Sequence, residues 1–255
     1  MQFTPALTLA RFLRRYKRFL VDVEFDDGRI AVAHSTNTGA LRGCLVPGAP
    51  VAIEAATNPA RKLAWTWKMI QVDRNWIGVD TSTAIPLARE ALVSGSLLPE
   101  LAGYDRMISE IGFGVEGRSR VDLLLARGGR APANKRPTGR ELYHGEERVY
   151  VELKSTTWVQ TRGAHEVACF PDAVTARGRK HLGDLVHMVQ QGHRAAMLYI
   201  VQRSDATRFA PADDIDPAYG QALRRALALG VEAYAVTTKV DPSGIRLERR
   251  IPVHT

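Results

Sequence analysis

The sequence lacks both a membrane-length apolar segment and a paired cysteine motif. Two cysteines occur in its 255 residues, and Cys44 and Cys169 are too distant along the chain to form a Cys-x-x-Cys motif. This excludes a disulfide scaffold, argues against a structural zinc site and makes a reducing compartment the default. The longest apolar run, residues 195–201, is far shorter than the roughly 20 residues that cross a bilayer. We therefore expect no membrane partner.

Two common catalytic signatures are also missing. The chain has no Gly-x-Ser-x-Gly motif and no Gly-Lys-Ser/Thr sequence. The first absence argues against a serine hydrolase with a nucleophile elbow, and the second argues against an ordinary nucleoside triphosphatase.

Acidic residues are fewer than basic ones. The 35 Lys and Arg against 27 Asp and Glu give a net charge of +8, and the sequence pI is about 9.8. This excess favours a polyanionic partner, although net charge alone does not identify one. A hydrophobic content of 45% excludes a mainly disordered chain.

The first 21 residues contain basic side chains and no acid. That composition is typical of a transit peptide, but the basic residues interrupt any apolar segment, and a strand-like alternation follows directly. We interpret the segment as part of the fold, just before the first strand, and expect the protein in the cytoplasm. Its charges form either a solvated face or a patch that contacts phosphates; they are Arg11, Arg14, Arg15, Lys17 and Arg18.

Residues 1–83 predict a first, all-β domain. Short alternating segments at 19–25, 29–33, 51–55, 65–72 and 76–79 are separated by turn residues. Such spacing favours a small barrel or a sandwich. A five-stranded barrel of the oligonucleotide-binding (OB) type fits the length.

Residues 84–255 predict a second domain of the α/β class. Helical patterns at 85–93, 174–191 and 217–229 alternate with strand patterns at 149–153, 195–201 and 231–236. In the second helix, an apolar stripe containing Leu182 and Leu185 is expected to face the core, with Lys180, His181 and Asp184 on another face.

The clearest candidate for chemistry is a pair of strand patterns with acidic residues. Asp122 interrupts an apolar strand, and Glu152 and Lys154 share one face of another because side chains alternate along a strand. If the strands are neighbours, two carboxylates converge beside an ammonium group. Carboxylates can hold a divalent metal, and the amine can stabilise a phosphoryl transition state. This is the arrangement of the PD-(D/E)XK nucleases. The alternative is an ordinary surface ion pair.

Over the whole chain, the sequence resembles the sugar fermentation stimulation protein family. The matching segments keep the family's order and are Arg-Tyr-Lys-Arg-Phe-Leu-Val-Asp at 15–22, Asn-Thr-Gly-Ala at 37–40, Ser-Arg-Val-Asp at 119–122, Glu-Leu-Lys-Ser at 152–155 and Phe-Pro-Asp-Ala-Val-Thr at 170–175, followed by Arg-Gly and Lys-His-Leu at 177–182. The resemblance implies an N-terminal OB-type barrel joined to a PD-(D/E)XK restriction-endonuclease-like domain. It also implies DNA binding and a role in regulating sugar utilisation.

The resemblance also implies roles for individual residues. Asp122 and Glu152 would bind Mg²⁺ or Mn²⁺, Lys154 would be catalytic, and Glu110 would be a further metal ligand. The residues expected to contact nucleic acid are Arg14, Arg15, Lys17, Arg18, Asn37 and Lys180.

Two departures from the family pattern are visible. The family's Pro-Asn-Thr-Gly segment begins here with Thr36, and the interval between the two acidic strands contains a long basic loop at 128–145. Two functions stay open. One is a DNA-binding regulator that uses the nuclease-like domain as a scaffold, and the other is an active metal-dependent nuclease of DNA or RNA. A homodimer is compatible with either.

Overall fold

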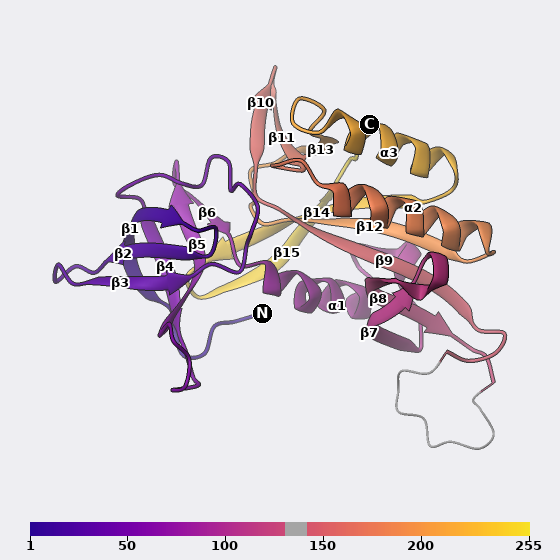
Figure 1. The fold of residues 1–255 in the computed structure, drawn as a ribbon, viewed down its shortest axis with the longest axis horizontal. Helices are drawn as coiled ribbons and strands as arrows, with labels where there is room; N and C mark the ends of the chain where they lie inside the picture. The colour runs from indigo at the N-terminus through magenta and orange to yellow at the C-terminus, as the bar shows by residue number, and fades with distance from the viewer. Residues whose placement is uncertain (131–141) are drawn as a thin grey trace.

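The structure is a computed structural model that describes residues 1–130 and 142–255. A small β-barrel formed by the N-terminal part of the chain lies beside a larger sheet with helices on both faces (Figure 1). Much of the basic loop expected at 128–145 lies outside the described residues. No helix in the described part of the chain is long and apolar enough to cross a membrane.

The N-terminal domain is the expected OB-type barrel. Its sheet order is β3-β2-β1-β4-β5-β6, and an additional pairing of β3 with β5 closes it. Its strands are β1 (Thr8–Tyr16), β2 (Leu20–Glu24), β3 (Ile30–His34), β4 (Pro50–Ala55), β5 (Trp65–Val72) and β6 (Asn75–Gly78).

One expectation about this barrel was wrong. The basic segment expected to precede the first strand is itself strand β1. Ala10 and Phe12 are buried in the barrel, while Arg11 and Arg14 between and after them are exposed. The alternation of a strand is therefore present, but long basic side chains occupy its outward positions.

The second domain contains a mixed six-stranded sheet of order β15-β14-β12-β9-β8-β7. The three central strands, β14, β12 and β9, are parallel, and the others are antiparallel to their neighbours. The strands are β7 (Arg106–Phe113), β8 (Ser119–Arg127), β9 (Glu147–Thr156), β12 (Arg194–Val201), β14 (Glu232–Asp241) and β15 (Gly244–Ile251).

Helices cover both faces of this sheet, as an apolar sheet core requires. Helix α1 (Ala84–Ser94) packs against one face, and α2 (Ala176–Gln190) and α3 (Pro217–Ala228) pack against the other. Helix α2 begins two residues later than predicted because Thr175 caps it, accepting the N–H of Gly178.

A small third sheet was not predicted. It consists of β10 (Val159–Arg162), β11 (His165–Phe170) and β13 (Arg208–Pro211). Strand β11 leads directly into the segment before α2, so this sheet determines where residues 170–175 lie relative to the barrel.

Several contacts fix the barrel to the segment that leads out of it and to the second domain. Asp80, next to the short 3-10 helix η1 (Thr81–Thr83), is 1% exposed and forms an ion pair with Lys68 of the barrel. It also accepts hydrogen bonds from Thr36 (2.8 Å) and Ser82 (2.7 Å). At another point, the carboxylate of Asp172 accepts the N–H of Leu41 at 2.7 Å.

Two further 3-10 helices are η2 (Pro99–Leu101) and η3 (Val115–Gly117).

Candidate metal and nucleic-acid site

The two predicted carboxylates meet where strands β8 and β9 separate. The last backbone pair of the two strands is Leu123 with Val151, and the same register places Asp122 opposite Glu152. Beyond that pair, the N–H of Leu153 is donated to Oδ2 of Asp122 at 2.7 Å. The carboxylate of Asp122 therefore occupies the position that a strand carbonyl would otherwise take, beside Glu152.

Lys154 and His181 both contact Glu152. The ammonium group of Lys154 donates to Oε1 of Glu152 at 2.5 Å, and Nδ1 of His181 lies 2.5 Å from the same oxygen. Glu152 is only 2% exposed. Its second oxygen, Oε2, is buried and has no hydrogen-bond partner among the described residues. A buried carboxylate oxygen without a partner is costly, so a cation is a suitable ligand for it.

The two carboxyl groups differ in acidity. Burial, and then the negative charge of Glu152, raise the pKa of Asp122 to about 6, despite the opposing effects of the Leu153 N–H and Lys154. Burial also disfavours the charged form of Glu152, but His181 and Lys154 outweigh it and the pKa of Glu152 lies below its usual value. Burial and the negative charge of Glu152 therefore both oppose the ionisation of Asp122.

Glu110 lies near this pair but does not complete a three-residue cluster. Its flanking residues pair across β7 and β8 in a register that places it opposite Asp122, and its charge contributes to the raised pKa of Asp122. Its side chain is exposed and its backbone φ is +58°. Among the described residues, no group of three or more His, Cys, Asp and Glu side chains could hold a metal ion. Glu110 as a metal ligand stays a prediction.

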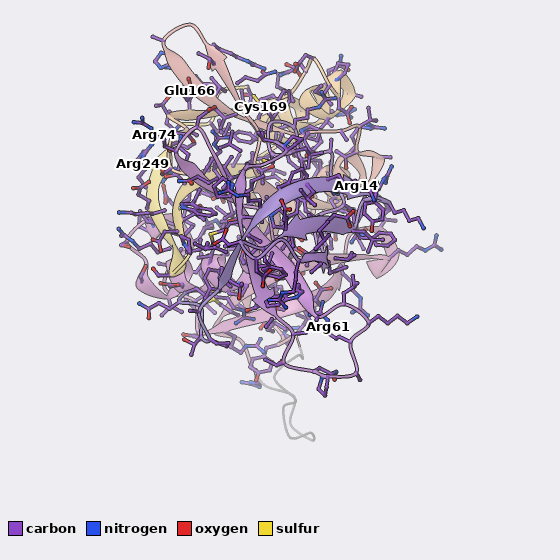
Figure 2. The ribbon with its side chains drawn as sticks, turned by 90° about the vertical axis from the view of Figure 1, so that its left-hand side faces the viewer. Arg14, Arg61, Arg74, Glu166, Cys169 and Arg249 are labelled. Carbon is purple, nitrogen blue, oxygen red and sulfur yellow. The ribbon has the colours of Figure 1, made fainter. Side chains whose placement is uncertain are left out.

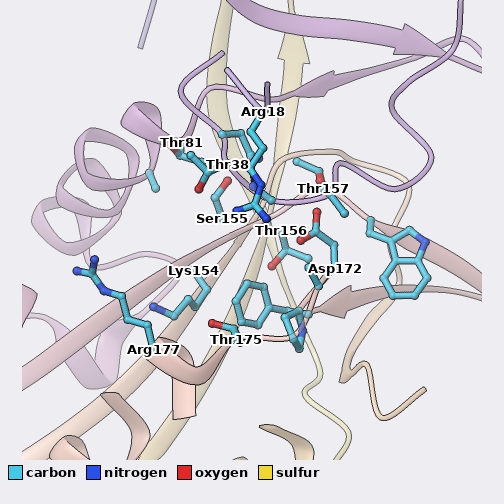
Figure 3. A pocket seen from close by; sticks show the side chains of 18 of the residues that line it. Arg18, Thr38, Thr81, Lys154, Ser155, Thr156, Thr157, Asp172, Thr175 and Arg177 are labelled. Carbon is cyan, nitrogen blue, oxygen red and sulfur yellow. Dashed lines mark hydrogen bonds between the residues drawn. The ribbon is translucent and has the colours of Figure 1, made fainter. Parts of the chain in front are cut away.

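Asp122 and Lys154 line a cleft between the two domains, with a volume of about 940 Å³. One side comes from the barrel, and the other comes from β9 and the segment before α2 (Figure 3). Of the predicted nucleic-acid contacts, four line the cleft: Arg15, Lys17, Arg18 and Asn37. Arg177 of α2 lines it as well, and sequence reasoning did not select that residue.

Arg15 and Asn37 shape the barrel side of the cleft. The guanidinium of Arg15 donates to the carbonyls of Asn37 (2.6 Å), Gly39 (2.8 Å) and Arg18 (2.7 Å). The side chain of Asn37 accepts the N–H of Gly39 at 2.8 Å and is largely buried. These two residues hold the loop, whereas Lys17 and Arg18 are exposed.

The other two predicted contacts lie elsewhere. Arg14 forms an ion pair with Asp22 at 2.7 Å, and Lys180 donates to Asp184 at 2.9 Å. Neither basic residue is among the described residues that line the cleft. Figure 2 shows Arg14 and Arg74 on opposite sides of the barrel end, so these two arginines do not belong to one patch.

His181, which contacts Glu152, was also not selected for the site by sequence reasoning. It was expected on a polar face of its helix, but it is 5% exposed and lies on the buried face. The signal was present, because Gly178, His181, Leu182 and Leu185 follow the i, i+3, i+4, i+7 spacing of a helix face.

Comparisons with known proteins agree with this architecture. The family model for the SfsA N-terminal OB domain matches residues 13–79, and the model for the sugar fermentation stimulation protein RE domain matches residues 82–244. The chain is 44% identical over 254 residues to the sugar fermentation stimulation protein homolog of Geobacter metallireducens, covering 99% of each. It is also 44% identical to the homolog of Thioalkalivibrio sulfidiphilus, covering 99% of this chain and 98% of that one.

A solved structure has the same fold. The structure of Pyrococcus furiosus SfsA in complex with Ca²⁺ matches with a TM-score of 0.80 and 26% identity, covering 100% of this chain and 98% of that one. The matches span the barrel, the sheet and the strands that bear Asp122 and Glu152. The chain therefore belongs to the sugar fermentation stimulation protein family.

Proposed function

We propose that this protein binds DNA in the interdomain cleft and a divalent cation, Mg²⁺ or Mn²⁺, between Asp122 and Glu152. The observation that carries the proposal is the convergence of these carboxylates at the separation of β8 and β9, next to a cleft with basic side chains. A role in regulating sugar utilisation, which the family name suggests, belongs to the same proposal.

The residues present fit a divalent cation. Glu152 offers a buried oxygen that has no hydrogen-bond partner among the described residues, and burial together with the adjacent negative charge raises the pKa of Asp122. A cation between the carboxylates would satisfy the oxygen and relieve the repulsion. That the relative from Pyrococcus furiosus was solved in complex with Ca²⁺ supports an oxygen-ligand site for a divalent cation in this family.

The cleft fits a polyanion on its barrel side. Lys17 and Arg18 project from one turn, and Arg177 lies on the opposite domain. Each neutralised phosphate releases counterions, so affinity for DNA is expected to fall steeply as salt rises.

Phosphodiester hydrolysis is the second candidate function, and Lys154 favours it. A scaffold that only binds DNA has no need of an ammonium group held 2.5 Å from Glu152. Lys154 is partly exposed to the cleft, where it can donate to a phosphate oxygen that gains negative charge in the transition state. Bound at this site, the cation would supply Lewis acidity toward a phosphoryl oxygen.

The test separates cation binding, DNA binding and cleavage. Mn²⁺ is titrated calorimetrically into wild type and Asp122→Asn, and DNA binding is measured with Ca²⁺ present. Supercoiled and single-stranded DNA are then incubated with Mg²⁺ or Mn²⁺ and wild type, Asp122→Asn or Lys154→Ala. We expect Asp122→Asn to lose Mn²⁺ binding, and only wild type to cleave. DNA that is bound but left intact by wild type would eliminate the hydrolase, and a failure to bind DNA at low salt would eliminate both functions.

A further inference from the structure

The walls of the interdomain cleft differ in chemistry. The barrel contributes basic side chains, whereas the side beyond β9 has three apolar or aromatic residues, Trp158, Phe170 and Val174; Leu45 of the barrel adds a further apolar side chain to the rim. Leu45 and Val174 are 41% and 69% exposed. Exposed apolar side chains at the entrance of a cleft gain contacts when a ligand with apolar surface covers them.

We propose that the cleft receives a single strand of DNA, with its phosphates against Arg18 and an unpaired base stacked on Trp158. The inference rests on the proposed DNA-binding function and specifies its substrate class. In duplex DNA the faces of each base are covered by neighbouring bases, so an aromatic wall can stack only on an unpaired base. A volume of about 940 Å³ is that of a large small-molecule pocket, which suits a few nucleotides of one strand.

Two buried hydroxyl groups lie in β9 beside the cleft. Oγ of Ser155 and Oγ1 of Thr156 are buried and have no partner among the described residues, and both residues line the cleft directly after Lys154. Thr156 is only 2% exposed. In Figure 3, Arg18 extends from the barrel toward this part of β9. A guanidinium group is a usual donor to phosphate oxygens, so Arg18 is the donor on this part of the cleft.

The backbone of the turn that presents Arg18 is strained. Lys17 and Arg18 have φ values of +49° and +66°, which side chains with a Cβ atom seldom adopt. Successive positive φ values are typical of tight hairpin turns, and Asp73 and Arg74 have them as well. Here the guanidinium of Arg15 donates to the carbonyl of Arg18 at 2.7 Å and so holds the turn in place over the cleft.

On the opposite side, Trp158 is anchored by its own backbone and by a neighbour. Its carbonyl accepts the N–H of Cys169 at 2.9 Å, and the guanidinium of Arg42 lies over one face of its ring, 5.6 Å from the ring centre. The side chain is half-buried against a small apolar cluster that contains Val167 and Cys169, so only its remaining exposed surface is open to a base. Trp158 follows Lys154 by four residues, a span of at most about 14 Å. One strand of a few nucleotides can therefore contact both residues.

A second acidic side chain, in addition to Asp122, faces the cleft. Asp172 lines it, but one of its carboxylate oxygens accepts the N–H of Leu41. Its charge also acts on the partly buried guanidinium of Arg15, whose pKa is lowered chiefly by burial. These two interactions reduce the repulsion that Asp172 would exert on a phosphate.

The test compares single strands with duplexes on the full-length protein. Fluorescence anisotropy is measured with a labelled 12-nucleotide oligothymidylate, a labelled hairpin duplex and a labelled 12-nucleotide oligouridylate, with Ca²⁺ in place of Mg²⁺. We expect the DNA single strand to bind at least about tenfold more tightly than the duplex. Loss of a stacked base in Trp158→Ala should weaken single-strand binding about 5- to 100-fold, and Trp158→Phe should restore most of it.

Arg18→Ala removes the charge, and alanine still has to adopt the positive φ of this position. It should weaken single-strand binding and lower the slope of log affinity against log salt by about 0.7. Arg74→Ala is the matched control, because Arg74 is also an exposed arginine in a barrel turn, with a φ of +68°, and lies outside the cleft. It should leave both values nearly unchanged.

The outcomes distinguish the inference from the function beneath it. Duplex binding as tight as single-strand binding, with Trp158→Ala binding like Trp158→Phe, would overturn the single-strand channel while leaving DNA binding intact. Tighter binding of the oligouridylate would overturn the assignment to DNA. No binding of any probe at low salt would overturn the proposed function itself. Thermal unfolding of each variant shows whether it is folded.

Discussion

His181 and Glu152, 29 residues apart in the sequence, lie with Nδ1 and Oε1 only 2.5 Å from each other in the interior of the second domain. His181 also meets the ring of Phe113 edge-on, with the ring centres 5.9 Å apart. The histidine is therefore held by packing on one side and orients the carboxylate of Glu152 on the other, which leaves Oε2 available to a cation.

The first prediction concerns this contact. His181→Ala should weaken Mn²⁺ binding about 10- to 100-fold, the usual effect of removing a residue that orients a metal ligand. His181→Asn, whose amide nitrogen takes the place of Nδ1, should recover part of the affinity. His187→Ala on the same helix is the control. Calorimetric titration measures the Mn²⁺ affinity of wild type and the three variants. An unchanged affinity in His181→Ala would refute the positioning role.

The second prediction concerns the pH dependence of stability. Because the pKa of Asp122 is raised to about 6 from 3.8, the folded chain binds this proton more tightly than the unfolded chain. Metal-free wild type therefore loses stability from this group as pH rises from about 4 to about 6, and the loss is complete above that range. In Asp122→Asn the amide oxygen can still accept the N–H of Leu153, and no carboxyl group ionises there. The variant should therefore be more stable than metal-free wild type at pH 7.5 by about 1–2 kcal/mol.

Urea unfolding in EDTA at pH 4.5 and pH 7.5 measures this difference. The advantage of Asp122→Asn should be small at the lower pH and complete at the higher one. Saturating Mn²⁺ should stabilise wild type and not the variant, because a ligand stabilises only the state that binds it. A variant less stable than metal-free wild type at pH 7.5 would mean that burial and the charge of Glu152 destabilise ionised Asp122 less than we infer.

The carboxylate pair was predictable because it depends on local rules. Alternation along a strand places Glu152 and Lys154 on one face, and the apolar neighbours of Asp122 mark it as an unusual residue in a buried strand. The barrel and the order of helices and strands in the second domain were predictable for the same reason. Each follows from periodicity and from turn residues within a few positions of one another.

The rest of the site depends on contacts between distant segments. Arg15 looked like a phosphate contact, but three of its hydrogen bonds go to backbone carbonyls of the barrel loops. The contact of Asp172 with Leu41 joins residues 131 positions apart. Neither has a local sequence pattern. The walls of the cleft exist only after the third sheet and the barrel have packed together, so Trp158 and Arg177 could not be selected in advance.

The third prediction concerns the junction of the domains. Asp80→Ala leaves the ammonium group of Lys68, which is 9% exposed, without its most buried partner, and also removes acceptors for Thr36 and Ser82. Loss of one member of a buried ion pair typically costs about 3–5 kcal/mol. Urea unfolding should show a loss of this size, whereas Asp27→Ala, which breaks an exposed pair with Arg29, should have no measurable effect. Equal results for the two variants would contradict a structural role for Asp80.

The fourth prediction separates stability from binding at the turn above the cleft. Arg18→Gly should relieve the left-handed strain at φ +66°, because glycine adopts such conformations without a Cβ clash. The relief, about 1 kcal/mol, is partly offset by the greater freedom of glycine in the unfolded chain. We therefore expect Arg18→Gly to be as stable as wild type or slightly more stable, while its affinity for single-stranded DNA falls as it does in Arg18→Ala. Thermal unfolding and anisotropy on the same samples give both quantities. If Arg18 served only to form the turn, the glycine variant would keep full DNA affinity, and the strain in this turn would need another explanation.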